Sequence, residues 1–514
     1  MNVIAYDLGT GGMKASLYGP EGECLASHFA AYDTHYPQSG WHEQRPDDWW
    51  TATVAATRNL LRDWSGAPES IQAIGISGHS LGVVPLDDGG RLLREQTPIW
   101  SDSRARDQAR QFFTGVDEEA WYRRTGCGFP PPLYSVFKIM WYRDHEPAMF
   151  RAIRAVVGTK DYVNCRLTGR IATDFSYASG TGVYDLLRWD YAADLIGHSG
   201  LAPEIFPALL PSTEVLGELT PAAATELGLP RTVKVVCGGV DNSCMALGAG
   251  NIAEGRVYNS LGSSSWIAAC SARPLLDARA RPYVFTHVLP GLFTSATSIF
   301  SAGTSLRWVR DTLCQNLVAE AARRGVDVYD QLIDVALASP VGARKLLFNP
   351  SLAGGNCLDA SPNLRGAFMG LDLGHTQADV IRATLEGIAL GLRVALDELR
   401  RLTTLAPRML VVGGGSRNRH WRQIFADVYG MEIVKTGVDQ QAAALGAAAL
   451  AAVGSGLWHD FTRIDAIHRV EDVAVPNPAN RAAYDELLPV FIEAGKGQAR
   501  IGDMLAALQA GASR

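Results

Sequence analysis

A carboxylate and several glycine-rich turns are the residues of this sequence best suited to chemistry. Asp241 ends the apolar run VKVVCGGV, directly after Gly238, Gly239 and Val240. A carboxylate at the end of a buried strand, beside glycines that leave space open, is where a general base is expected. Taken alone, the motif has an alternative reading in which Asp241 caps the helix that follows.

Two small-residue turns, about half a chain apart, are suited to binding phosphate groups. VIAYDLGTGGMKASLY near the start and RVYNSLGSSSWIAAC near the middle each combine a strand-like run, a turn and a second strand-like run. Glycine lets a ligand approach the backbone and leaves N–H donors uncovered, so both turns could surround phosphate oxygens. Coincidence of two common hairpins is the alternative. The residues expected on phosphates are Thr10, Gly11, Gly262, Ser263 and Ser264.

Two charged residues flank the first turn. Asp7, just before it, is placed to hold a hydrated Mg²⁺ beside the phosphates. Lys14, just after it, is a candidate phosphate partner. The alternatives are a turn-forming aspartate and a solvated strand lysine.

A third glycine-rich turn, VGGGSRN at 412–418, ends a strand-like run and leads into a helix-like segment. Its glycines would let a flat ligand lie against the backbone, and the start of the helix adds N–H donors. Gly414, Gly415 and Asn418 are therefore candidate nucleotide-binding residues, whereas a purely structural reading makes this a tight strand-to-helix turn.

Several classes of site are excluded by their missing motifs. The sequence has no Gly-x-x-x-x-Gly-Lys-Ser/Thr and no strand-associated Gly-x-Gly-x-x-Gly, so neither a P-loop nor a Rossmann site is expected. Its cysteines and histidines show no zinc-ligand or disulfide spacing. The segment GHSLG (78–82) matches a nucleophile elbow, but VVPLDDGG follows it where a helix is required. A serine hydrolase acting through Ser80 is therefore a distant alternative.

Length and composition describe an ordinary folded enzyme. The 514 residues exceed what one hydrophobic core supports, so we expect two domains, 1–248 and 249–514. The net charge of −6, without a basic block, argues against nucleic-acid and membrane partners. The amino terminus shows no signal-peptide pattern, and a cytoplasmic location is expected. The Ala-rich segment 442–458 is expected to be a buried helix.

Strand-like and helix-like segments alternate in both halves, which predicts an α/β fold. Short apolar runs at 72–77, 233–240 and 408–415 predict buried strands. A helix is expected over 46–64, with Trp50, Val54, Leu61 and Trp64 on its buried face. Another is expected from a Thr-x-x-Asp capping box at 376–379 to about residue 402.

Taken together, these segments resemble the FGGY family of carbohydrate kinases, especially its xylulokinase-like members. The resemblance covers nearly nine-tenths of the chain, with the motifs in the family's order. They are DLGTGGMKASLY, WHEQRPDDWW, TPIWSDSRA, KDYVNCRLTG, CGGVDNSCMALGAG, NSLGSSSWIA, SAGTSLRW and VVGGGSRNRHWRQIFAD.

The resemblance implies two ribonuclease-H-like domains of the actin-like ATPase kind that flank a deep cleft. It implies ATP and Mg²⁺ as cofactors, a small sugar or polyol as the acceptor, Asp241 as the catalytic base and Asp7 on the metal. His79, Ser80, Leu81, Trp100, Asp102 and Asn242 fall on the sugar side, and Gly303 joins the nucleotide side. The resemblance leaves open whether the protein forms a homodimer. The alternative to a kinase is a non-catalytic actin-like nucleotide-binding protein.

Two segments depart from the xylulokinase pattern. Where xylulokinases typically carry Gln-Met-His-Gly, this chain has His79, Ser80, Leu81 and Gly82. Their Ser-Gly-Glu-Arg-Thr-Pro loop corresponds here to AGGNCL at 353–358. Because leucine cannot hydrogen-bond a sugar hydroxyl, Leu81 predicts that D-xylulose is not the best substrate.

Overall fold

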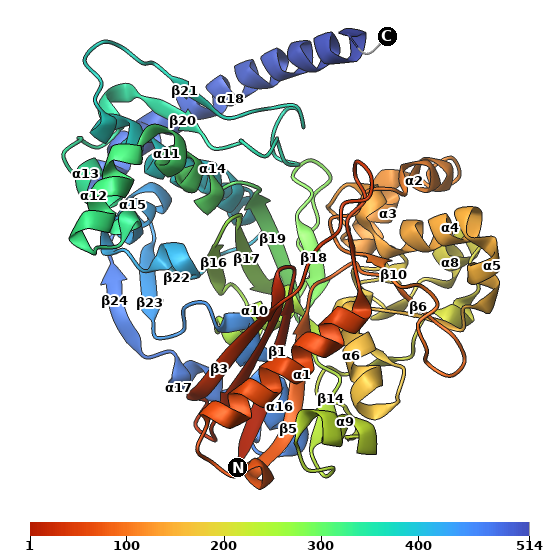
Figure 1. Ribbon diagram of the computed structural model, residues 1–514. Coiled ribbons are helices and arrows are strands. Elements are labelled where there is room, and N and C mark those ends of the chain that lie inside the picture. Colours follow the sequence, from red (N-terminus) through yellow and green to blue (C-terminus); the bar gives the residue numbers. More distant parts are fainter. Residues whose placement is uncertain (513–514) are drawn as a thin grey trace.

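The structure is a computed structural model that describes residues 1–512, and each half of the chain is built around a seven-stranded sheet (Figure 1). In the first sheet the order is β13-β14-β5-β1-β2-β3, with β15 also paired to β5. Its strands are β1 (Asn2–Gly9), β2 (Gly12–Tyr18), β3 (Cys24–Ala31), β5 (Ile71–Gly78), β13 (Val215–Glu218), β14 (Lys234–Val236) and β15 (Gly239–Val240).

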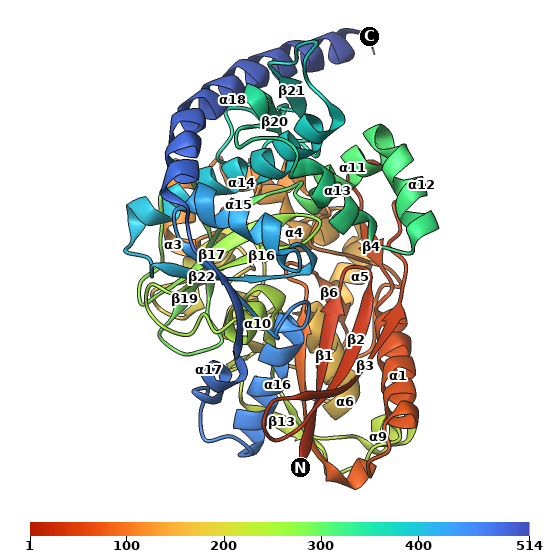
Figure 2. The same cartoon turned by 90° about the vertical axis from the view of Figure 1, so that its left-hand side faces the viewer.

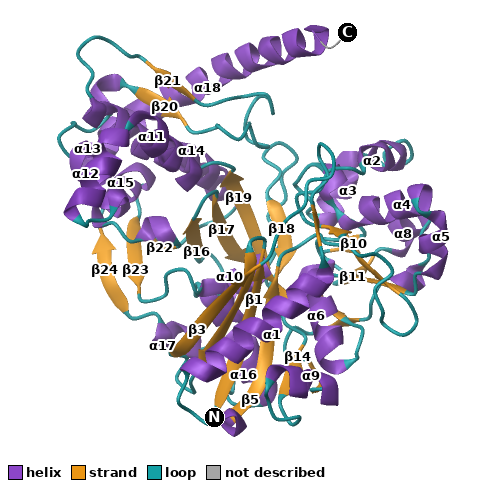
Figure 3. Cartoon of the chain, viewed as in Figure 1, coloured by secondary structure: helices purple, strands orange, loops and turns teal. Residues whose placement is uncertain are grey.

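The second sheet has the order β18-β19-β17-β16-β22-β23-β24. Its strands are β16 (Val257–Leu261), β17 (Ser265–Ser271), β18 (Tyr283–Thr286), β19 (Phe293–Ile299), β22 (Arg408–Val412), β23 (Glu432–Thr436) and β24 (Val470–Ala474). Figure 3 shows the strands of the two sheets in orange, with α10 between the sheets and most of the other helices around them. This arrangement confirms the predicted α/β class.

The two sheets repeat one topology. The hairpin β1–β2 is antiparallel, and β1 pairs in parallel with β5 on its other edge. The hairpin β16–β17 is likewise antiparallel, and β16 pairs in parallel with β22. Both predicted hairpins are thus present, each beside a parallel strand, and the repeat seen in the sequence is a repeat of structure.

Helices cover the sheets on their outer faces and form a lobe beside the first sheet (Figures 1 and 2). Those of the first half are α1 (Pro46–Asp63), α2 (Arg106–Phe112), α3 (Glu118–Thr125), α4 (Ser135–His145), α5 (Pro147–Ala152), α6 (Thr159–Thr168), α7 (Phe175–Ala178), α8 (Ala193–Ser199), α9 (Pro221–Leu227) and α10 (Asp241–Gly248). Those of the second half are α11 (Gly303–Leu313), α12 (Gln315–Arg324), α13 (Val328–Ala336), α14 (Gln377–Leu402), α15 (Arg419–Tyr429), α16 (Ala442–Ser455), α17 (Arg463–Ile467) and α18 (Pro478–Ala512).

The buried face of α1 differs from the predicted one. Trp50 is buried as expected, but Val54, Leu61 and Trp64 are only partly covered. Two threonines occupy the buried face because each hydroxyl donates to the carbonyl four residues earlier, Thr53 to Trp49 and Thr57 to Thr53, both at 2.7 Å. A threonine satisfied in this way can be buried like an apolar residue, and a pattern of apolar residues alone misses it.

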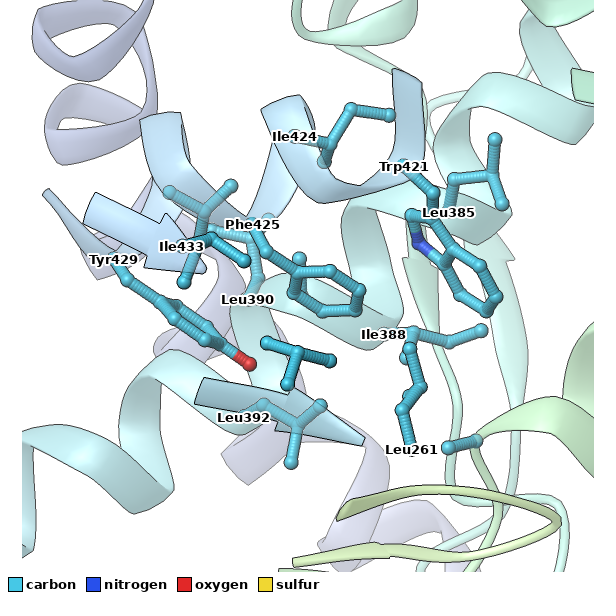
Figure 4. Packing of buried hydrophobic residues seen from close by; sticks show 14 of the residues in the cluster. Leu261, Leu385, Ile388, Leu390, Leu392, Trp421, Ile424, Phe425, Tyr429 and Ile433 are labelled. Carbon is cyan, nitrogen blue, oxygen red and sulfur yellow. The ribbon is translucent and has the colours of Figure 1, made fainter. Parts of the chain in front are cut away.

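The second half has its own hydrophobic core, in which α14 and α15 pack over the sheet (Figure 4). Helix α14 begins with the predicted capping box, in which the side chains of Thr376 and Asp379 each accept the backbone N–H of the other residue. The core includes Leu261, the last residue of β16, and Trp421 of α15, and a Cβ atom on Gly415 would contact both side chains. The second hairpin is therefore anchored to the helix that follows the third glycine-rich turn.

The two halves meet where α10 crosses α16. A Cβ atom on Gly446 would lie 1.9 Å from the carbonyl oxygen of Cys244, and one on Gly248 would lie 1.8 Å from that of Ala442. The helices therefore touch backbone to backbone, which only glycine permits. Helix α16 belongs to the second half of the chain yet packs against β1 and β5 of the first sheet; Figure 1 shows α10 between the two sheets.

A second contact joins the halves at β18. The ring of Tyr283 stacks on Phe129 of the first half, with centroids 3.9 Å apart. Val284 N–H donates to the carbonyl of Gly126 at 3.0 Å, and Ser243 Oγ donates to that of Thr286 at 2.9 Å. The proposed boundary at 248/249 falls in the segment between α10 and β16, which starts at Val257.

Two further observations concern disulfide bonds and membrane-spanning helices in the described part of the chain. All eight cysteines are free, and seven of them are buried or partly buried. Among the described helices, none combines the length and the apolar character that a membrane crossing needs. The Ala-rich helix α16 is buried between the halves, as its composition predicts.

We predict that Gly446→Ala destabilises the protein because the new methyl group cannot fit against Cys244. The free energy of unfolding should fall by ~1–3 kcal/mol or more, the usual cost of overpacking. Thermal and urea unfolding would measure it. The matched control is Gly197→Ala in α8, where a Cβ atom meets nothing within 4 Å; it should be neutral or stabilising by ~0.5–1 kcal/mol. Equal stability of the two variants would contradict the close crossing.

Candidate functional site

Three parallel strands of the first sheet end side by side at one edge. Leu8 of β1 pairs with Gly78 of β5, and Gly78 pairs with Val240 of β15. The next residue of each strand comes from a segment that the sequence singled out: the first hairpin turn, His79 and Asp241. The carboxyl edge of such strands is where α/β sheets usually bind ligands.

Asp241 is the first residue of α10, and Val240 occupies the N-cap position. The carboxylate accepts the N–H of Asn242 at 2.8 Å, and no described side chain donates to it. Burial raises its pKa to about 7, and the nearby charge of Asp7 adds to the rise. A carboxylate with a pKa near neutrality is suited to proton abstraction.

Buried polar side chains hold the segment that carries Asp241. Lys160 Nζ and Asn164 Nδ2 both donate to the carbonyl of Cys237, at 3.1 and 2.8 Å. The N–H of Val240 donates to Ser176 Oγ at 3.0 Å. The backbone on the amino-terminal side of Asp241 is thus fixed by side chains from α6 and α7.

Asp7 lies in β1 opposite Lys14, and Ser77 Oγ donates to its Oδ1 at 3.1 Å. Burial raises the pKa of Asp7, and Lys14 and Ser77 partly oppose the rise. No group of three metal-ligating side chains occurs among the described residues. Mg²⁺, however, usually takes only one or two carboxylates besides phosphates and water. Asp7, beside the first hairpin turn, fits that requirement, and Asp241 is close enough to Asp7 for like-charge repulsion.

The first hairpin turn is exposed and held from both sides. Thr10 and Gly11 are exposed, and a Cβ atom on Gly11 would meet nothing within 4 Å. Trp100 Nε1 donates to Thr10 Oγ1 at 3.0 Å, and Gln44 Nε2 donates to the carbonyl of Thr10 at 2.7 Å. The structure thereby brings Thr10, expected at the phosphates, into contact with Trp100, expected at the sugar.

The loop after β5 contains a buried histidine whose ring packs edge-on against Trp49. His79 is 2% exposed, and neither of its ring nitrogens has a described hydrogen-bond partner. Burial lowers its pKa to about 3, so the ring is neutral and offers one donor and one acceptor. Ser80 and Asn242 are also mostly buried, at 8% and 6% exposed. Leu81 has φ +60°, a left-handed conformation that is unusual for leucine.

Asp102 is fully buried, and both of its oxygens are bound within the protein. The N–H of His42 donates to Oδ2 at 2.7 Å, and Arg104 donates to both oxygens at 2.8–2.9 Å. Asp102 therefore shapes the loop that carries Trp100, and its carboxylate is already satisfied without a ligand.

A cavity of about 480 Å³ lies in the second half beside the second hairpin turn. Its walls combine apolar side chains, the glycine-rich turns and polar groups from three helices. The lining residues are Leu261, Gly262, Ser263, Gly303, Leu306, Arg307, Asp327, Tyr329, Asp330, Ile333, Gly414, Gly415, Arg417, Asn418, Trp421 and Gln440. Six of the predicted nucleotide residues thus meet here, and Ser264 is exposed at the same turn.

Some glycines of this cavity are required by close packing, and others leave space open for a ligand. A Cβ atom on Gly303 would lie 2.5 Å from the carbonyl oxygen of Gly262, to which its N–H donates at 3.0 Å. Gly415 packs against Leu261, and Gly413 has φ +94°. Gly262, by contrast, would meet nothing closer than 3.6 Å. The N–H of Gly262 donates to the carbonyl of Ser264 at 3.0 Å, so what Gly262 leaves open is the space beside the turn.

Asn418 is a structural member of the cavity wall. Its Oδ1 caps α15 by accepting the N–H groups of His420 and Trp421, at 2.9 and 3.4 Å. Its Nδ2 donates to Asp330 of α13 at 2.7 Å. The contribution of α13 was missed by the sequence reasoning, because VYDQLIDVA shows only an ordinary amphipathic pattern.

The first half reaches this cavity through one hydrogen bond. Lys14 Nζ donates to the carbonyl of Gln440, which lines the cavity, at 3.2 Å. The candidate site therefore runs from the cavity past Lys14 and Asp7 to Asp241 and His79. The serine-hydrolase reading fails in the structure, since the loop after Ser80 leads into strand β6 (Val84–Leu86) and not into a helix.

Family models match both halves of the chain. The model described as "FGGY family of carbohydrate kinases, N-terminal domain" matches residues 2–248, and the C-terminal domain of the same family matches 257–455.

Individual proteins match over nearly the full length. The chain is 30% identical to a xylulose kinase of Bacillus subtilis over 95% of each chain, and 27% identical to a gluconokinase of the same organism over 95% of this chain and 94% of that one. The crystal structure of a ligand-bound xylulose kinase from Lactobacillus acidophilus superposes with a TM-score of 0.87 at 26% identity, covering 97% of this chain and 98% of the other.

We predict that Gly262→Val weakens MgATP binding by about tenfold or more while the protein stays folded. The new side chain meets no protein atom closer than 3.6 Å at its Cβ but fills the space beside the turn. Calorimetry with an unreactive ATP analogue would measure the affinity. The control is Gly437→Val, an exposed glycine of the same half outside the cavity. If both variants bind the analogue like the wild type, the turn holds no phosphate.

Proposed function

The chain belongs to the FGGY family of carbohydrate kinases, and from that premise we propose that it transfers the γ-phosphoryl group of MgATP to a hydroxyl of a small open-chain sugar or polyol, with Asp241 as the general base. The observation that supports this most directly is the position of Asp241. Its carboxylate has no side-chain partner, has a pKa of about 7, and follows a strand that ends beside His79 and the first hairpin turn.

In this proposal the two hairpin turns bind the phosphates, and the cavity beside the second turn takes the adenosine. Its apolar wall of Leu306, Ile333 and Trp421 suits a flat base. Lys14, between the halves, would lie near the transferred group. Phosphoryl transfer depends mostly on positioning and charge neutralisation, which these groups can supply.

Asp7 is the residue that would hold Mg²⁺, through water, beside the first phosphate-binding turn. When bound, Mg²⁺ neutralises charge that develops on the phosphates. Asp241 itself would accept the proton of the attacking hydroxyl. A non-catalytic actin-like protein, the rival function, would leave this unpaired carboxylate without a role.

The sugar is proposed to lie against the loop after β5. The neutral, unpartnered ring of His79 offers hydrogen bonds to hydroxyl groups, and Ser80 lies beside it. The side chain of Leu81 belongs to the apolar cluster of the helical lobe and approaches Gly180, so it gives no polar contact. The relatives act on xylulose and on gluconate, according to their names, and a shifted pattern of hydrogen bonds favours a substrate other than D-xylulose.

We predict that Asp241→Asn lowers kcat for sugar phosphorylation by roughly 10²–10⁴-fold, the usual contribution of a general base. The affinity for an unreactive ATP analogue should change little, because the nucleotide cavity lies in the other half. Near-wild-type turnover of the folded variant would remove Asp241 from this role.

The same carboxylate predicts a pH dependence. A raised pKa means that Asp241 is protonated, and inactive as a base, below about pH 7. At saturating MgATP, kcat/KM for the sugar should therefore fall about tenfold for each pH unit below that value. A flat profile from pH 5.5 to 8 would contradict the assignment.

We also predict that D-xylulose is not the best substrate. A lost polar partner costs roughly 1–3 kcal/mol, or about one to two powers of ten in discrimination. A coupled ATP-consumption assay over ketoses, aldoses, polyols and D-gluconate would compare kcat/KM values. If D-xylulose leads the panel clearly, the inference from Leu81 is wrong.

A further inference from the structure

A buried lysine lies next to the two loops of the proposed sugar site. Lys138 of α4 is fully buried, and its neighbours on the helix belong to the apolar cluster of the helical lobe. Among the described residues no carboxylate lies within salt-bridge distance of its amine; the charges that act on it come from Asp102 and Arg104. Burying an unpaired ammonium is costly, so a lysine here needs a compensating interaction.

That compensation comes from two backbone carbonyls. Lys138 Nζ donates to the carbonyl of Leu81 at 3.0 Å and to that of Ile99 at 2.7 Å. Leu81 lies in the loop that carries His79 and Ser80, and Ile99 directly precedes Trp100. Leu81 and Ile99 are 18 positions apart in the sequence, and one amine joins their two segments.

The carbonyl of Leu81 belongs to a strained peptide. Leucine at φ +60° costs of order 1 kcal/mol or more and persists only where the surroundings hold it. The hydrogen bond from Lys138 Nζ to the Leu81 carbonyl stabilises this conformation. Burial lowers the pKa of the amine to about 7, and both the charged and the neutral amine retain at least two N–H donors for the two carbonyls.

We propose that Lys138 is a positioning residue for the sugar: it fixes the loop of His79 and Ser80 relative to Trp100, and so sets the geometry in which the hydroxyls are bound. The inference rests on the proposed location of the sugar. Lys138 makes no hydrogen bond to the nucleotide cavity or to the segment that carries Asp241, so we expect its main effect on acceptor binding.

The decisive variant is Lys138→Met, which retains the length of the side chain and removes the donors. We expect KM for the best sugar of the panel to rise about tenfold or more, because small displacements of positioning groups have large effects. KM for ATP and the affinity for an unreactive ATP analogue should stay within about twofold of the wild type.

The matched control is Tyr142→Phe, one turn further along α4. Tyr142 is also fully buried, and its hydroxyl donates to the carbonyl of Val83 at 3.1 Å, at the β6 end of the loop, without joining that loop to the segment of Trp100. It should lower the melting temperature without raising KM for the sugar. If both variants raise that KM equally, or if folded Lys138→Met leaves it unchanged, Lys138 has only a structural role.

Should Lys138→Met fail to fold, Lys138→Gln provides the same test, since its shorter amide cannot reach both carbonyls; an unchanged KM for the sugar would again overturn the proposal. The outcome is distinguishable from a failure of the proposed function. An incorrect base would appear as retained kcat in Asp241→Asn, whereas an incorrect positioning role appears only in KM for the sugar.

Discussion

The backbone contact between α10 and α16 is the constraint on which the rest of the structure depends. The two helices approach so closely that Gly248 and Gly446 cannot carry a side chain, and α16 continues this contact onto the first sheet through Gly75. Asp241 is the first residue of α10. The proposed base is therefore built into the junction of the two halves, and any change in the angle between them acts directly on its position.

The same glycine-rich segments serve both packing and binding, and the structure separates the two tasks. Gly303 and Gly415 are small because the second hairpin and Leu261 press against them. Gly11 and Gly262 meet no protein atom closer than 3.6 Å, so their small size leaves open space at the two turns. Glycines whose absent side chains would clash with nothing in the protein are the ones best interpreted as ligand contacts.

Hydrogen bonding divides the buried polar residues in a similar way. Asp102 and Lys160 have their polar atoms satisfied by neighbouring groups, which explains how they can be buried completely. His79 is almost as buried but has no described hydrogen-bond partner, and the half-buried Asp241 has one backbone donor. Because an unsatisfied buried polar group is costly, its retention is most simply explained by a ligand that completes the hydrogen bonding.

The sequence by itself determined the α/β class, the two hairpins with their glycine-rich turns, the capped helix α14 and the buried helix α16. These features depend on local chemistry: glycine in turns, a capping box, and apolar runs of definite period. The repeated hairpin also indicated two similar halves. The family resemblance, carried by short motifs in a fixed order, supplied the kinase class.

Only the tertiary structure decided which of these segments meet. The pairing of Leu8, Gly78 and Val240 places three distant segments at one edge, and no local pattern specifies that register. The burial of Thr53 and Thr57 depends on hydrogen bonds that become visible only in the folded helix. Lys138 gave no signal either, because a lysine in a helix normally faces water. Its role depends on two carbonyls contributed by separate loops, and only the folded chain brings them together.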